Sequence, residues 1–252
     1  MPKETLEDLQ NGYFLYQDAE GFRFGMDAVL LAHFVRLRKG EKVCDLGCGS
    51  GIIPLLLAAQ YPEAAITGLE INSRSAELAQ KSVDYNGLTD RVKVVCGDIH
   101  RAETLFGRQS FKVVVSNPPY LRAGSGRQSP NEQRAAARHE VLVTLREVAA
   151  AAGRLLTSSG RFYLVHRPER LSEILSACGE NHLAVKKLRL VYPYADREAS
   201  LVLLEAVKGA AGGMKVLPPL IIFNKEGQYT EEVQKIYAPA PDTAGKTAEN
   251  EG

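Results

Sequence analysis

The chain lacks tryptophan, has only three methionines and carries almost no net charge. Lysine and arginine number 31 against 30 aspartates and glutamates, which leaves a formal net charge of +1. This balance gives no overall preference for nucleic acid or for an anionic membrane, because long-range attraction to either needs an excess of positive charge. Any contact with a polyanion must therefore come from local groups of cationic side chains.

Cysteine is also scarce and follows no metal-binding pattern. The four cysteines, Cys44, Cys48, Cys96 and Cys178, show no paired spacing, and neither a signal peptide nor a long apolar run is present. We therefore expect a cytoplasmic protein with reduced thiols, no metal and no membrane partner. Cys44 and Cys96 fall inside predicted strands, and we expect both in the core. The histidines at 33, 100, 166 and 182 show no metal spacing either, and we expect them to be structural or exposed.

The length of 252 residues suits one α/β domain with appendages. From residue 42 onward, β-rich runs alternate with helical patterns, which predicts a mostly parallel sheet covered by helices on both faces. Residues 185–191 and 200–207 follow each other without a helix and should form an antiparallel pair at one edge. The prediction is a Rossmann-like, doubly wound, seven-stranded sheet. The other strands are expected at residues 42–46, 65–70, 92–96, 112–116 and 161–166, and the clearest helices at 72–86, 141–156 and 168–180.

The two ends of the chain follow other patterns. Residues 1–12 carry little pattern, 13–17 and 22–24 should form a hairpin, and Asp27 is expected to cap a helix that ends near Gly40. We interpret residues 1–40 as a hairpin-and-helix flap and 41–208 as the main domain. In the extension, 209–237, the apolar residues 217–223 should dock on the domain, followed by a short helix near 231–236. The tail, 238–252, is predicted to be disordered because its composition cannot bury a core.

The stretch best suited to chemistry is Ser116-Asn117-Pro118-Pro119-Tyr120, directly after the apolar run 111–115. Two consecutive prolines fix φ and keep Asn117 out of the helical region, so this rim should be extended and stiff. It presents an amide side chain, backbone carbonyls and an aromatic ring, which together suit a planar amine. A simple turn at a strand end would use the same residue types, so the preceding residues decide between the two interpretations.

The first strand of the predicted sheet ends in Asp45-Leu46-Gly47-Cys48-Gly49-Ser50-Gly51. This is a glycine-rich turn in which the backbone can approach a ligand closely. A dinucleotide-binding turn is the rival interpretation, but Ile52 stands where its last glycine belongs. Asp45 also disfavours that rival, because a carboxylate repels a pyrophosphate and attracts a ligand with an ammonium and a sulfonium group. S-adenosylmethionine is such a ligand.

Polar side chains end four successive predicted strands. Asp45, Glu70, Asp98 and Asn117 all fall at carboxyl ends, where open α/β sheets bind ligands. Glu70 suits ribose hydroxyls, and Asp98 suits an adenine amino group with Ile99 packing on the ring. Taken alone, Glu70 is commonplace at an exposed strand end, and Asp98 is more often a helix cap. Their joint placement favours one cofactor site.

These residues resemble the successive motifs of class I S-adenosylmethionine-dependent methyltransferases of the N-P-P-Y branch, which methylate exocyclic amino or amide nitrogens. Residues 22–31 and the segment Ala137-Arg138-His139-Glu140 are similar to bacterial tRNA adenine-N6 methyltransferases, which modify the anticodon loop of a valine tRNA. The resemblance implies an enzyme with S-adenosylmethionine as cofactor and tRNA or another RNA as substrate. The cofactor residues expected from the pattern and the resemblance are Gly25, Asp27, Asp45, Gly47, Gly49, Gly51, Glu70, Ile71, Asp98, Ile99 and Asn117.

On the acceptor side, we expect catalysis by Asn117, Pro118, Pro119 and Tyr120. The Asn117 side-chain oxygen and the Pro118 carbonyl would accept the two N–H bonds of the amine, and Tyr120 would stack on a splayed-out base. Lys186, Lys187 and Arg189 lie on a predicted edge strand, where charge also prevents aggregation, and we favour that interpretation for them. Phosphate contacts are instead expected from Arg122, Arg127, Arg134, Arg138, His139 and Arg167.

Other activities remain open. The same motif serves the guanine N2 amine of ribosomal RNA and the glutamine amide of a release factor. The glutamine enzymes are expected to carry a helical domain ahead of the glycine turn, and only about 40 residues precede it here. A catalytically inactive RNA-binding module is disfavoured by the intact polar strand ends. A nicotinamide-dependent oxidoreductase is disfavoured by Asp45 and the missing third glycine.

Overall fold

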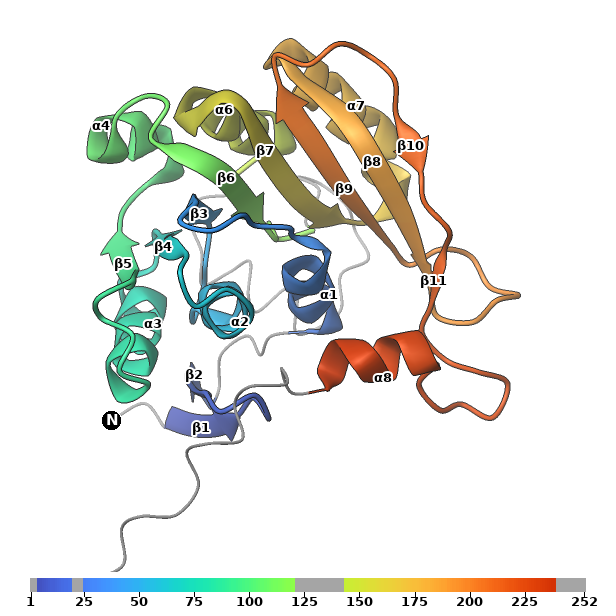
Figure 1. Cartoon of the computed structure of the whole chain (residues 1–252), viewed down its shortest axis with the longest axis horizontal. Helices are drawn as coiled ribbons and strands as arrows, with labels where there is room; N and C mark the ends of the chain where they lie inside the picture. Colours follow the sequence, from blue (N-terminus) through green and yellow to red (C-terminus); the bar gives the residue numbers. More distant parts are fainter. Residues whose placement is uncertain (1–3, 20–24, 121–142, 239–252) are drawn as a thin grey trace, which may run out of the picture.

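The computed structural model describes residues 4–19, 25–120 and 143–238, and one large sheet dominates them (Figure 1). Within these ranges the sheet has nine strands in the order β10-β8-β9-β7-β6-β3-β4-β5, with β11 also paired to β8. Strands β3 to β7 run parallel, and β9 is antiparallel to both β7 and β8. The bounds are β3 (Lys42–Leu46), β4 (Ala65–Glu70), β5 (Val92–Cys96), β6 (Phe111–Ser116), β7 (Leu156–His166), β8 (Leu183–Tyr192) and β9 (Leu201–Lys208).

The sheet is larger than the seven strands that the sequence predicts. All seven are present, with β7 starting earlier than expected. Two short strands of the C-terminal extension, β10 (Lys215–Val216) and β11 (Leu220–Ile221), add to them by pairing in parallel with β8. They pair there because an edge strand offers free N–H and C=O groups. The extension ends in α8 (Glu231–Tyr237), close to the predicted helix.

Helices cover both faces of the sheet, as the doubly wound prediction requires (Figure 1). Along β3, Val43 packs into one core cluster and Cys44 into the other, because successive strand side chains point to opposite faces. The first face is covered by α1 (Met26–Phe34), α2 (Ile52–Gln60), α3 (Ser73–Tyr85) and α8. The second face is covered by α4 (Ala102–Phe106), α6 (Leu145–Leu155) and α7 (Leu171–Glu180), with the short 3-10 turns η1 (Ile99–Arg101) and η2 (Pro168–Arg170) preceding α4 and α7.

Three local predictions need correction. Strand β2 (Phe14–Asp18) pairs with β1 (Glu4–Asp8), which the sequence did not indicate, while the expected partner 22–24 lies outside the described residues. Helix α1 begins after Gly25 rather than at a cap by Asp27, and it ends at Phe34 instead of near Gly40. Cys96 is exposed rather than buried, because it is the last residue of the outer strand β5.

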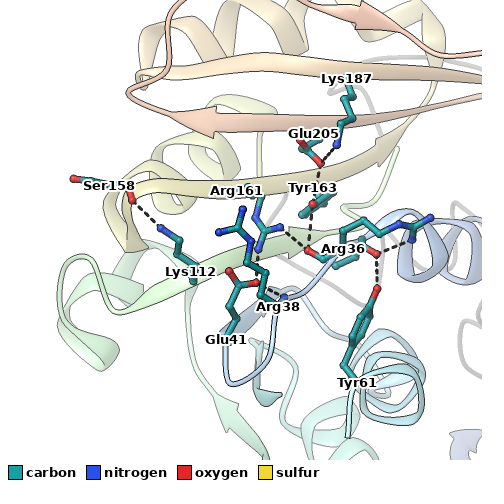
Figure 2. Close-up of polar contacts among 11 residues, drawn as sticks. Arg36, Arg38, Glu41, Tyr61, Lys112, Ser158, Arg161, Tyr163, Lys187 and Glu205 are labelled. Atoms are coloured by element: carbon teal, nitrogen blue, oxygen red, sulfur yellow. Dashed lines mark hydrogen bonds and ion pairs between the residues drawn. The ribbon is translucent and has the colours of Figure 1, made fainter. Parts of the chain in front are cut away.

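The linker between α1 and β3, residues 35–41, is tied to the sheet by polar contacts (Figure 2). Arg161 forms an ion pair with Glu41 and donates a hydrogen bond to the Arg36 carbonyl at 2.8 Å. The Tyr61 hydroxyl donates to the Val35 carbonyl at 3.0 Å. These contacts hold α1, and with it Asp27, in a defined place beside the sheet.

The same network contains a buried carboxylate, Glu205, which is only 6% exposed. It accepts hydrogen bonds from the Tyr163 hydroxyl and from Lys187 Nζ, both at 2.9 Å, as Figure 2 shows. The other cations of β8 also have partners within the chain. Lys186 donates to backbone carbonyls, and Arg189 pairs with Glu232 at 2.7 Å. Their contacts agree with the structural interpretation of these charges.

Candidate functional site

The glycine turn between β3 and α2 leaves open space where a ligand could approach its backbone. Gly47, Gly49 and Gly51 have φ of 77°, 55° and 92°, a left-handed region that favours glycine. A Cβ at Gly47 or Gly49 would meet no heavy atom within 4 Å, whereas a Cβ at Gly51 would lie 3.1 Å from the Cβ of Ala79. The first two glycines therefore face free space, and Gly51 allows α3 to pack closely.

Glu70, at the end of β4, holds this turn in place. One carboxylate oxygen accepts a hydrogen bond from the Gly49 N–H and the other from the Asn72 N–H, each at 2.8 Å. Asn72 in turn caps α3, as predicted, by accepting from the Ser75 N–H at 2.9 Å. Glu70 thus joins the glycine turn to the start of α3, and its remaining lone pairs are available for the predicted ribose contact.

Hydrogen bonds between neighbouring strand ends bring the predicted site residues together. The Gly97 N–H donates to the Glu70 carbonyl at 2.8 Å, which places Asp98 beside the end of β4. The Ser116 hydroxyl donates to the Leu46 carbonyl at 2.8 Å, which places Asn117 beside the glycine turn. The second contact crosses the point between β3 and β6 where the strand order reverses, and such switch points are where open α/β sheets bind ligands.

Asp45 is the least satisfied polar group of this cleft. Its side chain is fully buried, and neither carboxylate oxygen has a hydrogen-bond partner among the described residues. Burial, together with the negative charge of Glu70, raises the pKa of Asp45 well above its ordinary range. A buried carboxylate without a partner is costly unless a ligand supplies one. The residue therefore fits a ligand with a cationic donor, such as the ammonium of S-adenosylmethionine.

Asp98 caps the turn η1, which is the ordinary role that its sequence position also allows. One of its oxygens, Oδ1, accepts from the His100 N–H at 2.9 Å and contacts the His100 Nδ1 at 2.7 Å. The other ring nitrogen of His100 lies 3.0 Å from a Glu147 oxygen. These hydrogen bonds raise the pKa of His100, and backbone and side-chain donors lower the pKa of Glu147 to about 2. Oδ2 of Asp98 has no partner in the described part of the chain and stays available for the predicted adenine contact.

The two isoleucines expected at the cofactor differ in burial. Ile71 is 40% exposed at the carboxyl end of β4, although isoleucine is normally buried. Ile99 is only 8% exposed and packs in the core cluster of the second face. An apolar contact with a cofactor therefore suits Ile71 better than Ile99.

On the acceptor side, one tyrosine hydroxyl joins the rim to helix α1. The Tyr120 hydroxyl lies 2.6 Å from Asp27 Oδ2 and 3.0 Å from Asn117 Oδ1. Since a phenol has one hydrogen, the shorter contact to a carboxylate takes it. The Asn117 oxygen then remains available to accept a hydrogen bond from a substrate. A Cβ at Gly25 would lie 2.7 Å from Asp27 Oδ1, so any larger residue there would displace the Asp27 carboxylate.

The Tyr120 ring contacts two side chains that follow or end β7, Arg167 and His166. The Arg167 guanidinium lies 5.1 Å from the ring centroid, and the His166 ring meets it edge-on at 4.9 Å. Burial and the charge of Asp27 raise the pKa of Tyr120 well above its ordinary range, so the phenol stays protonated. The Arg167 guanidinium covers one face of the ring on which the sequence predicts that a base stacks.

His166 is a site residue that sequence reasoning did not select. It is 1% exposed, and burial lowers its pKa to about 4, so the ring is neutral near pH 7. Nδ1 accepts the Arg167 N–H at 2.7 Å, whereas Nε2 has no partner among the described residues. Its position at the end of the fifth parallel strand, beside the Asn117 rim, was the available signal.

A cavity of about 300 Å³ opens beside Tyr120, Asp27 and Arg167. It joins the acceptor rim to the loop between β8 and β9 and to the C-terminal extension. Within the rim, Pro118 is buried and Pro119 is exposed. The predicted phosphate contacts Arg122, Arg127, Arg134, Arg138 and His139 lie outside the described residues.

Two classes of feature are absent from the part of the chain that the structure describes. No group of three or more His, Cys, Asp or Glu side chains there is arranged to hold a metal ion. No helix among those residues has the length and apolar character needed to cross a membrane.

Comparison with known proteins identifies one family. A family model described as a methyltransferase domain matches residues 37–213. Among curated proteins, a tRNA1(Val) (adenine(37)-N6)-methyltransferase of Porphyromonas gingivalis is 30% identical, covering 86% of this chain and 88% of that protein. An enzyme of the same description from Dickeya chrysanthemi is also 30% identical, with 89% of each chain covered.

Solved structures show the same fold. A structure described as a predicted O-methyltransferase from Agrobacterium tumefaciens superposes with a TM-score of 0.70 at 26% identity, covering 85% of this chain and 98% of that one. Geranyl diphosphate methyltransferase in complex with S-adenosylmethionine superposes with a TM-score of 0.55 at 17% identity, over 73% of this chain and 84% of that chain. The second likeness extends to the fold alone.

Proposed function

The chain belongs to the methyltransferase domain family, and from that premise we propose that it transfers a methyl group from S-adenosylmethionine to N6 of an adenine in tRNA. The observation that carries the proposal is the position of the Asn117 amide. It follows β6 beside the glycine turn, and its oxygen, 3.0 Å from the Tyr120 hydroxyl, has a second lone pair that can accept a hydrogen bond from the substrate. The curated relatives described as tRNA adenine-N6-methyltransferases support the choice of acceptor.

The cofactor side is assigned from contacts and burial. Asp45 would pair with the cofactor ammonium, Glu70 would accept from the ribose hydroxyls, and Asp98 would accept from the adenine amino group, with Ile71 and Ile99 as apolar neighbours. The backbone at Gly47 and Gly49 would let the cofactor approach closely, and Gly51 lets the turn pack against α3. Gly25 and Asp27 border the methionine end. The bound cofactor supplies a methyl group that its sulfonium makes electrophilic, so the residues must mainly align the acceptor and exclude water.

The acceptor side holds the amine. The lone pair of an adenine amine is delocalised into the ring, so accepting its N–H bonds favours the charge that develops as the nitrogen attacks. We assign this role to the Asn117 side-chain oxygen and the Pro118 carbonyl, with Pro119 keeping the segment stiff. Tyr120 would stack on the base. Arg167, which covers the Tyr120 ring, would then turn to a phosphate of the RNA.

The remaining assignments concern RNA contacts and domains. Arg122, Arg127, Arg134, Arg138 and His139 are proposed to contact phosphates, because they follow the rim directly in sequence. The proposed domain boundaries are a flap at 1–40, the methyltransferase domain at 41–208, an extension at 209–237 and a tail at 238–252. We propose a cytoplasmic location, with tRNA as the partner and no metal requirement.

The test is methyl transfer from labelled cofactor to tRNA, followed by mass spectrometry of the nucleosides. Asn117→Ala should lower the rate by about 10²- to 10³-fold, as loss of one transition-state hydrogen bond does, while cofactor affinity stays unchanged. The matched control is Asn181→Ala, because Asn181 lies between α7 and the amino end of β8, away from the carboxyl ends that form the site. Unchanged activity in Asn117→Ala contradicts the mechanism. Methylation of a ribose oxygen instead of N6 would favour the oxygen chemistry named for the Agrobacterium protein.

A further inference from the structure

The cavity beside Tyr120 is assembled from five separated stretches of the chain. Asp27 comes from α1, Tyr120 and Arg167 follow β6 and β7, Leu201 begins β9, and Ile222 and Phe223 form the wall from the C-terminal extension. Its volume of about 300 Å³ lies at the lower end of the range of about 300–1,000 Å³ typical of small-ligand pockets.

The wall from the C-terminal extension is fixed by main-chain hydrogen bonds. The Ile222 N–H donates to the Tyr192 carbonyl at 2.8 Å, and the Phe223 N–H donates to the Pro193 carbonyl at 2.9 Å. Ile222 is 3% exposed and packs into the core cluster that also contains α1 residues. The wall is therefore a continuation of the sheet edge rather than a loosely attached segment.

Phe223 belongs to a group of aromatic rings. Phe223 stacks on Tyr229 with centroids 5.3 Å apart and an interplanar angle of 18°. Tyr229 stacks on Tyr237 at 5.5 Å and 4°, and the tilted Tyr194 ring lies 5.4 Å from Phe223. Such aromatic pairs add to the energy of burial, so the Phe223 ring is held in one orientation at the cavity.

The chemistry of the lining suits one class of occupant. The wall from the extension is apolar and aromatic, whereas the rest of the lining includes the Arg167 guanidinium, the Asp27 carboxylate and the Tyr120 ring. A planar heterocycle attached to a phosphate suits both kinds of group, because its ring can pack against Phe223 and its phosphate can meet Arg167.

We propose that the C-terminal extension completes the acceptor pocket and that Phe223 is a specificity-determining residue that packs against the target base. This inference rests on the proposed function and extends it to residues outside the matched methyltransferase domain. That domain covers residues 37–213, so Asp27 on one side and Phe223 on the other are both contributed by flanking segments. The domain supplies the rim that holds the amine, and the C-terminal flank selects the base.

The experiment measures steady-state methylation of tRNA by the full chain with wild-type Phe223, Phe223→Leu and Phe223→Tyr. Leucine keeps apolar bulk without an aromatic face, and tyrosine restores the face. Phe223→Leu should raise the KM for tRNA at least tenfold, the effect of losing one aromatic stacking contact, with kcat nearly unchanged. Phe223→Tyr should stay near wild type. Val216→Ala, on exposed β10 of the same extension, is the control.

Two parallel measurements separate the outcomes. Calorimetry with S-adenosylhomocysteine should give the same affinity in all variants, which also shows that Phe223→Leu is folded. A wild-type KM in Phe223→Leu overturns the inference while the proposed function stands. Weakened cofactor binding with an unchanged KM also overturns it, because the cavity would then belong to the cofactor. A wild-type protein that neither binds nor methylates tRNA overturns the proposed function and this inference together.

Discussion

Two buried carboxylates on the same sheet have opposite surroundings. Glu205 in β9 accepts hydrogen bonds from Tyr163 and Lys187, whereas Asp45 in β3 is more deeply buried and has no partner among the described residues. Burial of a charge is tolerated where the chain itself supplies donors. The contrast therefore separates a carboxylate that maintains the fold from one whose partner has to come from outside the chain.

The largest effect is expected from a substitution that removes the charge of Asp45. Asp45→Asn keeps the shape but removes the charge, and a hydrogen bond to a charged group contributes about 1.5–3 kcal/mol. The dissociation constant of S-adenosylmethionine, measured by calorimetry, should rise about 10- to 100-fold. The melting temperature of the cofactor-free protein should stay the same or rise, because the substitution removes a buried charge that lacks a partner. A fall in that temperature together with unchanged affinity would contradict the assignment.

The pH dependence of cofactor binding tests the same carboxylate without mutation. In the cofactor-free protein the pKa of Asp45 is raised, and an ammonium partner favours the ionised form and lowers it again. Binding therefore releases a proton below the raised pKa. Affinity should rise with pH, by up to about tenfold per pH unit, and level off above that pKa. Calorimetry in buffers of different ionisation enthalpy counts the protons released when the cofactor binds. The Asp45→Asn protein should release none.

The matched change at the other carboxylate sharpens the comparison. Glu205→Gln leaves an acceptor for one donor but removes the charge that Tyr163 and Lys187 share. The free energy of unfolding, from urea denaturation, should fall by about 1–2 kcal/mol, moderated because the Lys187 side chain is 41% exposed and can reach water. Cofactor affinity should not change. A loss of affinity equal to that of Asp45→Asn would remove the distinction between the two carboxylates.

The smallest effect is expected at His100, whose carboxylate partners are both partly exposed. Its raised pKa means that the protonated ring adds stability below its ordinary pKa, and this contribution is lost as pH rises through the raised value. The lowered pKa of Glu147 means that its contribution is lost only as pH falls toward about 2. His100→Gln should therefore cost about 0.2–1 kcal/mol near neutral pH, since solvent screens exposed pairs. Urea denaturation at about pH 6 and about pH 9 should show a smaller cost at the higher pH.

Much of the fold could be predicted because its signals are local. The cap at Asn72 and the glycine stop at Gly87 define α3, and the β-rich runs define the strands from β3 to β9. Strands β10 and β11 could not be found in this way, because they are two residues long and exist only by pairing with β8. The pairing of β1 with β2 was missed for a related reason, since apolar and polar residues alternate only weakly over residues 4–8.

The candidate site was predicted as a set of residues but not as a set of contacts. Strand ends alone could place Asp45, Glu70, Asp98 and Asn117 along one edge. The hydrogen bond from Tyr120 to Asp27 joins residues far apart in sequence. The position of the Arg167 guanidinium over the Tyr120 ring depends on the packing of β7 against the rim. Such contacts arise from tertiary packing, which single-sequence patterns do not encode.

The order in which the cavity walls occur along the chain has a consequence for how the site is encoded. The glycine turn, Glu70 and Asp98 leave the ribosome early, whereas Ile222 and Phe223 emerge only after the whole parallel core. Every cofactor residue expected from the sequence precedes residue 118, so a chain that ends after β9 keeps all of them and lacks only the Ile222 and Phe223 side of the cavity. Cofactor binding and acceptor binding are therefore encoded in successive parts of the chain.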